Sequence, residues 1–403
     1  MCSCTQLHRM ANPVSRSIAV LCSICAAFLP LAACTTAGGP AQAPAVKCSP
    51  TQLHVGVVVE TATGSLITMD ELLDKLSRVS VIYVGETHTS TEDHKIQLEL
   101  LRKLSRGGRC VELAMEMFPA TAQPIIDRYI SGGMSEEDFL KEVKWEEIWG
   151  FPYSLYRGLI DWQKENHMPV IGLNAPNQIV QKVARNGLDS LSPDERSLLA
   201  REFHLDDPTN RERVRKGYSE HEKGRIKDFE SFFEAQLAWE ETMAQTLAQR
   251  LKQTDPSCKI MVAVGKGHIN DRLGVPYLTR LRTPYEYATV APVPIDYPFC
   301  TIDPNLADYV VITDKSEPFH RPRLGVTIQS TASGRGVEIL GVLPDSPAAA
   351  AHLGKGDTII SINGSPVNNL DEVVQAMSKG GPNYKLIVER GKKKITVTVT
   401  VGQ

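Results

Sequence analysis

Two histidines stand in similar turns of the sequence, each three residues after a glycine. These turns, Gly85–His88 and Gly265–His268, both follow short apolar runs, and Glu116 stands near the end of a third such run. Imidazoles and carboxylates together can hold a divalent metal ion or work as general acid and base. The candidate catalytic residues are therefore Glu86, His88, Glu116 and His268, and the candidate metal ligands are His88, Glu116 and His268.

A simpler explanation exists for each histidine alone, because histidine is a common hydrogen-bonded turn residue. Two glycine turns of the same kind, together with an acid inside an apolar run, favour a shared site. If the three runs are neighbouring parallel strands, their carboxyl ends meet at the edge where open α/β sheets bind ligands.

The elements that must position these residues alternate short apolar runs with long amphipathic stretches, which is typical of an α/β fold. Unbroken apolar strands indicate a mostly parallel sheet flanked by helices. We predict a hairpin from 54–60 and 65–68, and a helical insertion between 173 and 259 with its clearest helix at 230–252. The predicted strands are 79–84, 110–117, 168–173, 259–264, 287–290 and 309–312.

The last part of the chain differs in pattern and charge. After the proline-rich stretch 318–322, residues 321–403 carry 10 basic and 6 acidic residues, whereas the whole chain has a net charge of -3. The ordered blocks around Gly356–Gly364 resemble the small, β-rich PDZ domain of bacterial periplasmic proteases. Such a domain binds an extended peptide or a protein C-terminus as an added strand. The residues predicted to bind the peptide carboxylate are Arg323, Leu324, Gly325 and Val326.

The start of the chain is typical of a lipoprotein signal peptide. Arg16 precedes the apolar run Ile18–Leu31, which is too short for a stable span, and small residues then lead to Cys34. We expect lipidation of Cys34 after cleavage, with secretion in soluble form as the alternative. The residue after Cys34 is Thr35 and not an aspartate, which in a Gram-negative bacterium favours sorting of the lipoprotein to the outer membrane, on its periplasmic or surface face. The predicted organisation is 1–33 signal peptide, 34–50 flexible tether, 51–318 α/β domain and 319–403 PDZ domain.

Four cysteines remain in the folded part of an exported chain. Cys110 and Cys258 each precede a predicted strand, so we favour a Cys110–Cys258 disulfide together with Cys48–Cys300. Buried free thiols are the alternative.

Five sequence blocks, in order, resemble the ChaN-like haem-binding lipoprotein family, which shares a superfamily with the Tiki metalloproteases and the erythromycin esterases. The resemblance covers about residues 51–300, and Glu240 departs from it because aspartate is more usual there. It implies an exported protein that binds haem and serves haem or iron uptake, on a fold whose relatives use the same histidines and glutamates for hydrolysis. The blocks are 85–88, 113–118, 171–176, 236–244 and 265–269.

Haem needs an apolar slot and an axial ligand. Aromatic residues concentrate between Trp145 and Trp162, although an aromatic stripe at helical spacing is more often core than cofactor site. The candidate axial ligands are Tyr153, Tyr156 and His268, and the sequence does not choose among them. Without a Cys-x-x-Cys-His motif, the haem is expected to bind non-covalently.

Other function classes fit poorly. The charge balance gives no basic field for nucleic acid, and neither a nucleophile elbow nor a phosphate-binding loop is present. We therefore favour a membrane-anchored haem-binding protein over an enzyme. One alternative is a metal-dependent hydrolase whose PDZ domain selects the substrate, with a divalent metal in place of haem. Another is a scaffold in which the α/β domain is degenerate and the PDZ domain carries the function. For the PDZ domain itself, the alternative to peptide binding is packing on the α/β domain or formation of a homodimer.

Overall fold

The computed structural model describes residues 46–47, 53–220, 228–295, 301–315, 324–331, 334–378, 383–391 and 393–401. The predicted signal peptide and the lipidation site Cys34 therefore lie outside the described residues, as do Cys48, Cys300 and Arg323. Within the described part, no helix has the length and apolar character that crossing a membrane requires.

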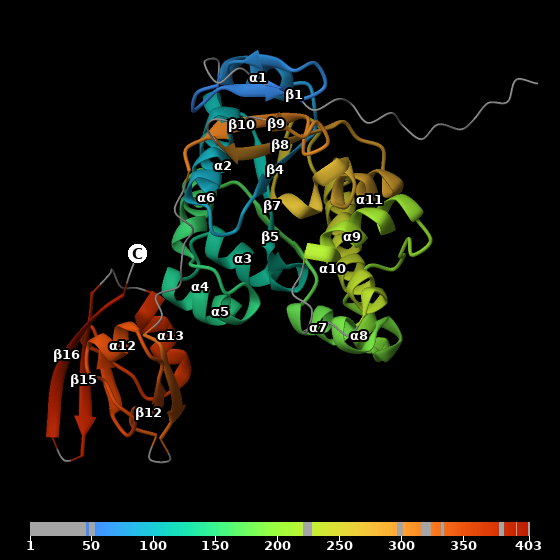
Figure 1. The fold of residues 1–403 in the computed structure, drawn as a ribbon. Helices are drawn as coiled ribbons and strands as arrows, with labels where there is room; N and C mark the ends of the chain where they lie inside the picture. Colours follow the sequence, from blue (N-terminus) through green and yellow to red (C-terminus); the bar gives the residue numbers. More distant parts are fainter. Residues whose placement is uncertain are drawn as a thin grey trace, which may run out of the picture. The chain divides into compact units, whose positions relative to one another are not determined.

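An eight-stranded sheet forms the centre of the α/β domain (Figure 1), with the order β3-β2-β10-β8-β4-β7-β5-β6. Every neighbouring pair from β10 to β6 is parallel, whereas β2 is antiparallel to both β3 and β10. This arrangement confirms the predicted mostly parallel sheet and the hairpin beside it. The strands are β2 (Val58–Glu60), β3 (Ser65–Ile67), β4 (Val81–Glu86), β5 (Val111–Pro119), β6 (Val170–Asn174), β7 (Lys259–Gly265), β8 (Tyr287–Pro294) and β10 (Tyr309–Thr313). A separate short pair joins β1 (Val46–Lys47) to β9 (Thr301–Ile302).

The helices of this domain follow the strands along the chain, as crossover connections do. Between β6 and β7 the chain makes the predicted helical insertion, and its longest helix, α10, ends within a residue of the predicted bounds. The helices are α1 (Met69–Leu76), α2 (Thr91–Leu104), α3 (Gln123–Ile130), α4 (Glu136–Val143), α5 (Trp145–Ile148), α6 (Ser154–Glu165), α7 (Asn177–Asn186), α8 (Pro193–Ser197), α9 (Pro208–Glu220), α10 (Phe229–Leu251) and α11 (Val275–Arg282).

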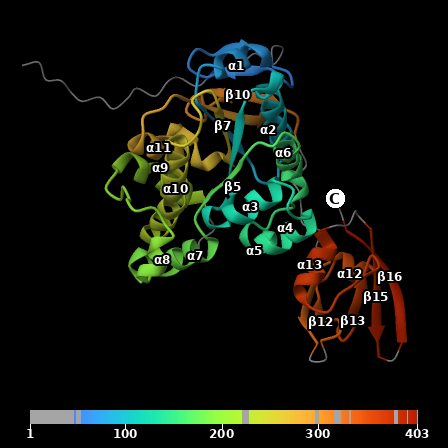
Figure 2. The same ribbon diagram turned by 180° about the vertical axis from the view of Figure 1, so that it is seen from behind.

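Both faces of the central strands are covered, which explains why these strands are apolar throughout. In β4, Ile82 and Val84 pack with α2, α3 and α6, whereas Val81 and Tyr83 pack with α10 and α11 on the other face. Figures 1 and 2 show these two helical layers on either side of the sheet. The alternation of side chains along the strands thus fixes which helices meet each face.

A disulfide joins the starts of two adjacent strands. Cys110 and Cys258, which precede β5 and β7, are bonded with their Cα atoms 4.6 Å apart. This confirms the predicted Cys110–Cys258 bond. The bond lies at the amino ends of the strands, so the carboxyl ends remain free to form a site.

The PDZ region has its own sheet, ordered β11-β12-β13-β15-β16, with β14 paired to β13. Asp357 in the Gly-Asp block is almost completely buried and receives two hydrogen bonds from the guanidinium of Arg390, each 2.7 Å long. This pair ties the start of β13 to the end of β15. The elements are β11 (Val326–Ser330), β12 (Val337–Val342), α12 (Pro347–Ala350), β13 (Thr358–Ile362), β14 (Ser365–Pro366), α13 (Leu370–Ser378), β15 (Asn383–Arg390) and β16 (Lys393–Thr400).

Candidate functional site

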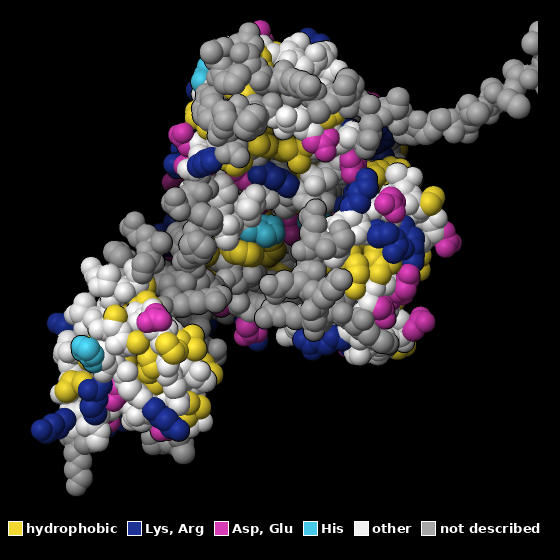
Figure 3. Space-filling view, in the orientation of Figure 1, with side chains coloured by type: hydrophobic (Ala, Val, Ile, Leu, Met, Phe, Trp, Pro, Cys, Tyr) yellow, Lys and Arg dark blue, Asp and Glu magenta, His cyan; other side chains and the backbone are white. Residues whose placement is uncertain are grey.

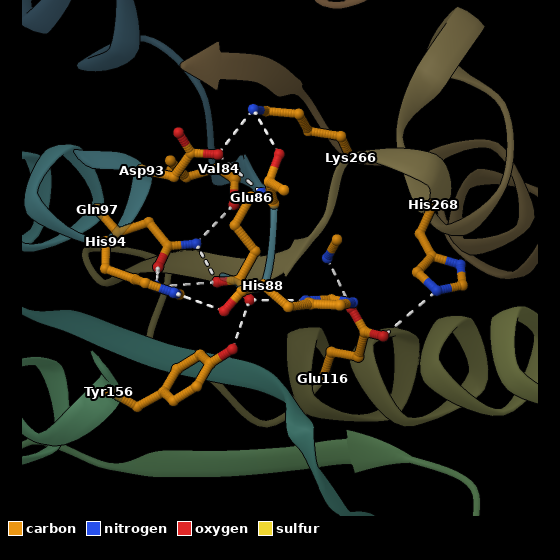
Figure 4. A network of polar contacts seen from close by, with 12 residues as sticks. Val84, Glu86, His88, Asp93, His94, Gln97, Glu116, Tyr156, Lys266 and His268 are labelled. Carbon is orange, nitrogen blue, oxygen red and sulfur yellow. Dashed lines mark hydrogen bonds and ion pairs between the residues drawn. The ribbon is translucent and has the colours of Figure 1, made fainter. Parts of the chain in front are cut away.

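The strand order brings the predicted residues to one edge of the sheet. β7 lies between β4 and β5 and runs parallel to both, and Glu86 at the end of β4 is paired in register with Gly265 at the end of β7. Figure 4 shows Glu86, His88, Glu116 and His268 gathered at this edge. The grouping expected from parallel strands is therefore present.

Glu86 is the buried centre of the first half of this network. Its Oε1 atom lies 2.9 Å from Nδ1 of His88 and accepts a hydrogen bond of 2.8 Å from the hydroxyl of Tyr156. Its Oε2 atom accepts from Nε2 of Gln97 at 2.9 Å and lies 3.4 Å from Nδ1 of His94. Burial alone would raise the pKa of Glu86, but the hydrogen bonds from the two histidines outweigh it and lower the pKa to about 2. Glu86 is therefore an anion that fixes its neighbours.

His88 lies at the boundary between this network and a cavity. Its ring meets the ring of Trp149 at a centroid distance of 4.8 Å and that of Phe151 at 5.1 Å. Burial would lower the pKa of His88, but its hydrogen bond to Glu86 and the charge of Glu116 raise it. A Cβ atom at Gly265 would lie 2.9 Å from Cε1 of His88, so glycine is what lets the imidazole approach this backbone.

Glu116 connects the two histidine turns. Its Oε2 atom accepts a hydrogen bond of 2.6 Å from the backbone N–H of Gly265, and its Oε1 atom lies 3.3 Å from Nε2 of His268. Burial would raise the pKa of Glu116, but the charge of His268 and its hydrogen bond lower it. Glu116 is thus a buried carboxylate inside β5, as the sequence pattern predicts.

His268 has carboxylates at both ring nitrogens. Its Nδ1 atom lies 3.0 Å from Oε1 of Glu240, and Oε2 of Glu240 accepts a 2.5 Å hydrogen bond from Arg213. Burial would lower the pKa of His268, but Glu116 and Glu240 raise it to about 10. Glu240 is itself fully buried, yet the charges and hydrogen bonds of Arg213 and His268 lower its pKa to about 2.

These contacts give Glu240 a role that the sequence leaves open. Glutamate at this position of α10 reaches both His268 and Arg213, which is on α9. Arg213 also donates to the carbonyl oxygen of Gly267 at 2.7 Å, so it holds the second histidine turn from the outside. No spacing in the sequence indicates Arg213, because its helix belongs to the insertion.

Lys266 connects the turn at residues 265–268 to the turn at residues 85–88 through a second set of polar contacts. Nζ of Lys266 lies 2.7 Å from Oδ2 of Asp93 and 3.2 Å from Oγ1 of Thr87. Asp93 is buried and also accepts from the backbone N–H of Thr87. The turns at residues 85–88 and 265–268 are therefore bound to each other as well as to Glu116.

A cavity of about 270 Å³ opens beside these residues. Figure 3 shows a histidine next to hydrophobic side chains on this face of the α/β domain. Seven of the twelve lining residues are aromatic or aliphatic and five are polar or charged, so the cavity can meet both apolar and polar groups of a ligand. The lining residues are His88, Glu116, Met117, Pro119, Ile148, Trp149, Phe151, Asn174, Ala175, Asn177, Trp239 and His268.

The proposed haem ligands occupy different places. His268 lines the cavity, whereas Tyr153 and Tyr156 are not among its lining residues. Tyr156 is fully buried and donates to Glu86, and Tyr153 packs edge-on against Trp145 at 5.3 Å. Within the described residues, no group of three or more His, Cys, Asp or Glu side chains is arranged to hold a metal ion, so the metal set remains a prediction.

In the PDZ region the predicted loop is partly described. Gly325 has a φ of +76°, and a Cβ atom there would lie 2.2 Å from Cβ of Ser346, so only glycine fits. The carbonyl oxygen of Gly325 accepts from Leu343, and that of the buried Leu324 accepts from Ala348. Val326 begins β11, which pairs only with β12 among the described strands. β11 is therefore an edge to which a further strand can add.

Comparisons with known proteins define the class of both regions. Residues 72–278 match the family described as haem-binding uptake, Tiki superfamily, ChaN, and residues 322–401 match the PDZ domain. The chain belongs to the ChaN family of the Tiki superfamily and carries a C-terminal PDZ domain.

A solved structure described as cofacial heme binding to ChaN of Campylobacter jejuni has the same fold. The TM-score is 0.50 at 15% sequence identity, over 63% of this chain and 95% of that one. Among curated proteins, serine protease HTRA1 of Xenopus tropicalis is 42% identical over 65 residues, which is 16% of this chain and 14% of that protein. Protein RETICULATA-RELATED 5, chloroplastic, of Arabidopsis thaliana is 28% identical over 139 residues, 31% of this chain and 18% of that protein. The chain thus spans less than a fifth of either curated relative.

Proposed function

We propose that this protein is an exported, membrane-anchored haem-binding protein whose PDZ domain binds peptide or protein C-termini. The observation that carries the haem proposal is the cavity of a ChaN-family domain, which has Trp149, Phe151 and Trp239 as well as imidazole in its wall. The ChaN protein of Campylobacter jejuni, which shares the fold, is described as binding heme.

The residues around the cavity suit a porphyrin. Trp149, Phe151 and Trp239 provide flat apolar surface, and histidine is a common axial ligand of haem iron. The cavity is slightly smaller than the roughly 300–1,000 Å³ of typical ligand pockets, so a porphyrin would enter it only in part. Bound haem would supply the iron, and the residues of the cavity would orient the part of the porphyrin that enters it.

Titration with haem tests this proposal. Hemin added to the purified apo-protein should give a Soret band shifted from that of free hemin and saturating at a fixed stoichiometry. Trp149→Ala should weaken binding because it removes one wall of the cavity, whereas Trp162→Ala serves as a control, since Trp162 does not line the cavity. A hemin spectrum that never saturates in the wild-type protein would contradict the proposal.

The proposed location is the outer membrane, through lipid on Cys34, and the proposed role is haem or iron uptake. These rest on the sequence before Cys34 and on the description of the family as one of haem-binding uptake. Cys34→Ser should move the protein from the detergent-extracted membrane fraction to the soluble fraction. Retention of the variant in the membrane would contradict lipid anchoring.

For the PDZ domain, the loop at Gly325 and the free edge of β11 support capture of a peptide carboxylate. Peptides that end in a free carboxylate after an apolar residue should bind the full chain more tightly than their amides. Gly325→Ala should abolish the difference, whereas Gly341→Ala is a matched control because its added Cβ meets nothing within 4 Å. Equal binding of acids and amides would contradict the proposal.

A metal-dependent hydrolase is the second candidate function. The observation that favours it is the contact between His88 and the buried anion Glu86, because such a pair can orient a general base. Metal analysis of the purified protein and a peptide-cleavage screen test it, with His88→Gln as the inactive comparison. Turnover that depends on added metal and on His88 would favour this candidate over haem binding.

A further inference from the structure

Two exposed leucines lie beside the proposed peptide-binding edge of the PDZ region. Leu340 belongs to β12 and is 36% exposed, and Leu343 directly follows β12 and is 60% exposed. Leu343 has the largest exposed fraction of any large hydrophobic residue in the described part of the chain. Apolar side chains that gather on the surface of a soluble protein mark a candidate surface for a partner.

Leu343 adjoins the loop that is proposed to bind the peptide carboxylate. Its backbone N–H donates a hydrogen bond of 2.8 Å to the carbonyl oxygen of Gly325. Gly325 immediately precedes β11, the strand to which the peptide is proposed to add. Leu343 therefore lies close to the place where the last residues of a bound peptide would be.

A β-bulge brings Leu340 to the same surface. Thr327 of β11 pairs with Gly341, and the next residue of β11 pairs with Ile339, so Leu340 is an extra residue with no pairing partner in β11. Ile339 is buried in the PDZ core, whereas Thr327 and Leu340 are exposed. The outer face of the sheet beside the peptide-binding edge thus carries Thr327, Leu340 and Leu343.

The geometry of an added strand determines which peptide side chains reach this face. Side chains alternate between the two faces of a sheet, so a peptide whose last side chain points to the core side turns its second and fourth side chains from the end outward. Neighbouring strands lie about 4.8 Å apart, which places the peptide backbone about 10 Å from β12. A small side chain does not span this distance, whereas a large apolar side chain can lie over Thr327 and meet a leucine.

The charge on this face disfavours acidic side chains. Farther from the loop, Gln329 of β11 pairs with Glu338 of β12, with Nε2 of Gln329 3.3 Å from Oε2 of Glu338. Gln329 is exposed on the same face as Thr327, two residues before it along the strand. The carboxylate of Glu338 would repel an acidic side chain of the peptide.

On this basis, which rests on the proposed capture of a peptide carboxylate, we infer that Thr327, Leu340 and Leu343 form a second specificity site of the PDZ domain. This site selects protein C-termini with a large apolar side chain at the second or fourth position from the end. Covering the two leucines removes apolar surface from water, which stabilises the complex. The face is continuous with the free edge of β11, so a peptide added there covers it without any further interface, which favours a peptide over a second copy of the chain.

Peptide titrations of the full-length chain test this inference. The fluorescent peptides keep a C-terminal valine with a free carboxylate and carry tryptophan, alanine or aspartate at the second and fourth positions from the end. The tryptophan peptides should bind at least about tenfold more tightly than the alanine peptides, because they bury more apolar surface. The aspartate peptides should bind most weakly.

Variants of the two leucines separate this face from the rest of the groove. Leu340→Ser and Leu343→Ser change exposed positions, and circular dichroism checks that both variants fold. The double variant should reduce the preference for tryptophan over alanine to less than about threefold, with unchanged affinity for the alanine peptides. Leu281→Ser is the matched control, because Leu281 is a similarly exposed leucine, at 47%, on α11 of the α/β domain.

The contrary results have different meanings. If acid peptides bind more tightly than their amides but the second and fourth residues have no effect, the second specificity site is wrong while carboxylate capture stands. A tryptophan preference that survives in the double variant also contradicts the site. A wild-type dimer in sedimentation that Leu343→Ser dissociates, without any tryptophan preference, would make the face an interface between copies and overturn the inference. If no peptide binds in either form, carboxylate capture and the second site fail together.

Discussion

The turns at residues 85–88 and 265–268 look alike in sequence but have different surroundings. Each follows a buried strand and places a histidine three residues after a glycine. His88 contacts one buried carboxylate through one nitrogen, whereas His268 contacts two carboxylates through both. The difference arises because α10 delivers Glu240 to only one of the turns. Similar local sequences therefore acquire different chemistry from distant helices.

Loss of Arg213 should cause the largest change, and it should act only on the second turn. Arg213→Met leaves the charge of fully buried Glu240 with fewer partners, so the free energy of unfolding should fall by about 3 kcal/mol. Urea unfolding measures it, and Arg201→Met, at an exposed position, should change the value by less than about 0.5 kcal/mol. Equal effects of the two variants would show that Arg213 does not support His268.

A methyl group at Gly265, in the turn at residues 265–268, should displace His88 in the turn at residues 85–88. Gly265→Ala places a Cβ atom 2.9 Å from Cε1 of His88 and 3.4 Å from Oε2 of Glu116. We expect the free energy of unfolding to fall by about 1–3 kcal/mol and hemin binding to weaken. Gly267→Ala is the matched control, because its Cβ would meet nothing within 4 Å. If both variants bind hemin equally, the close approach of His88 to the backbone of Gly265 does not contribute to hemin binding.

The pH dependence of stability should distinguish the histidines. The folded pKa of His268 is about 10 against an ordinary value of 6.5, so its contribution is complete below pH 6.5 and is lost between pH 6.5 and 10. The pKa values of Glu86 and Glu240 are lowered to about 2 from 4.5, so their contributions are present above pH 4.5 and are lost toward pH 2.

His268→Gln should therefore flatten the alkaline fall in stability more than His88→Gln does. The pKa of His88 is also raised, by its hydrogen bond to Glu86 and by the charge of Glu116, but only one carboxylate is hydrogen-bonded to its ring. Urea unfolding between pH 5 and 9 measures both slopes. An alkaline slope unaffected by His268→Gln would contradict the paired carboxylates as the cause.

Much of the fold follows from local pattern. The six predicted strands of the α/β domain all occur with shifts of a few residues at their ends, because buried parallel strands are apolar throughout. The gathering of Glu86, Glu116 and His268 at one edge follows from their positions at strand ends. The bond between Cys110 and Cys258 follows for the same reason, since both precede strands that are neighbours.

The rest of the site depends on helices, and the spacing of residues in the sequence does not predict where those helices pack. Tyr156 is part of an aromatic stripe, whose spacing indicates core more often than a haem ligand, yet its hydroxyl reaches Glu86. Arg213 lies on α9, a mainly polar helix, and nothing in its sequence indicates a contact with Glu240. These residues act through tertiary packing, so their roles become visible only when the helices are in place.

The disulfide has a practical consequence for obtaining the protein. Cys110 and Cys258 are separated by 148 residues, and in the chain-entropy model a bond that closes so long a loop stabilises a fold by about 4–5 kcal/mol. A reducing cytosol keeps such thiols unpaired. Recombinant chain made there would start without this stabilisation, so secretion into an oxidising compartment is the better route to native material.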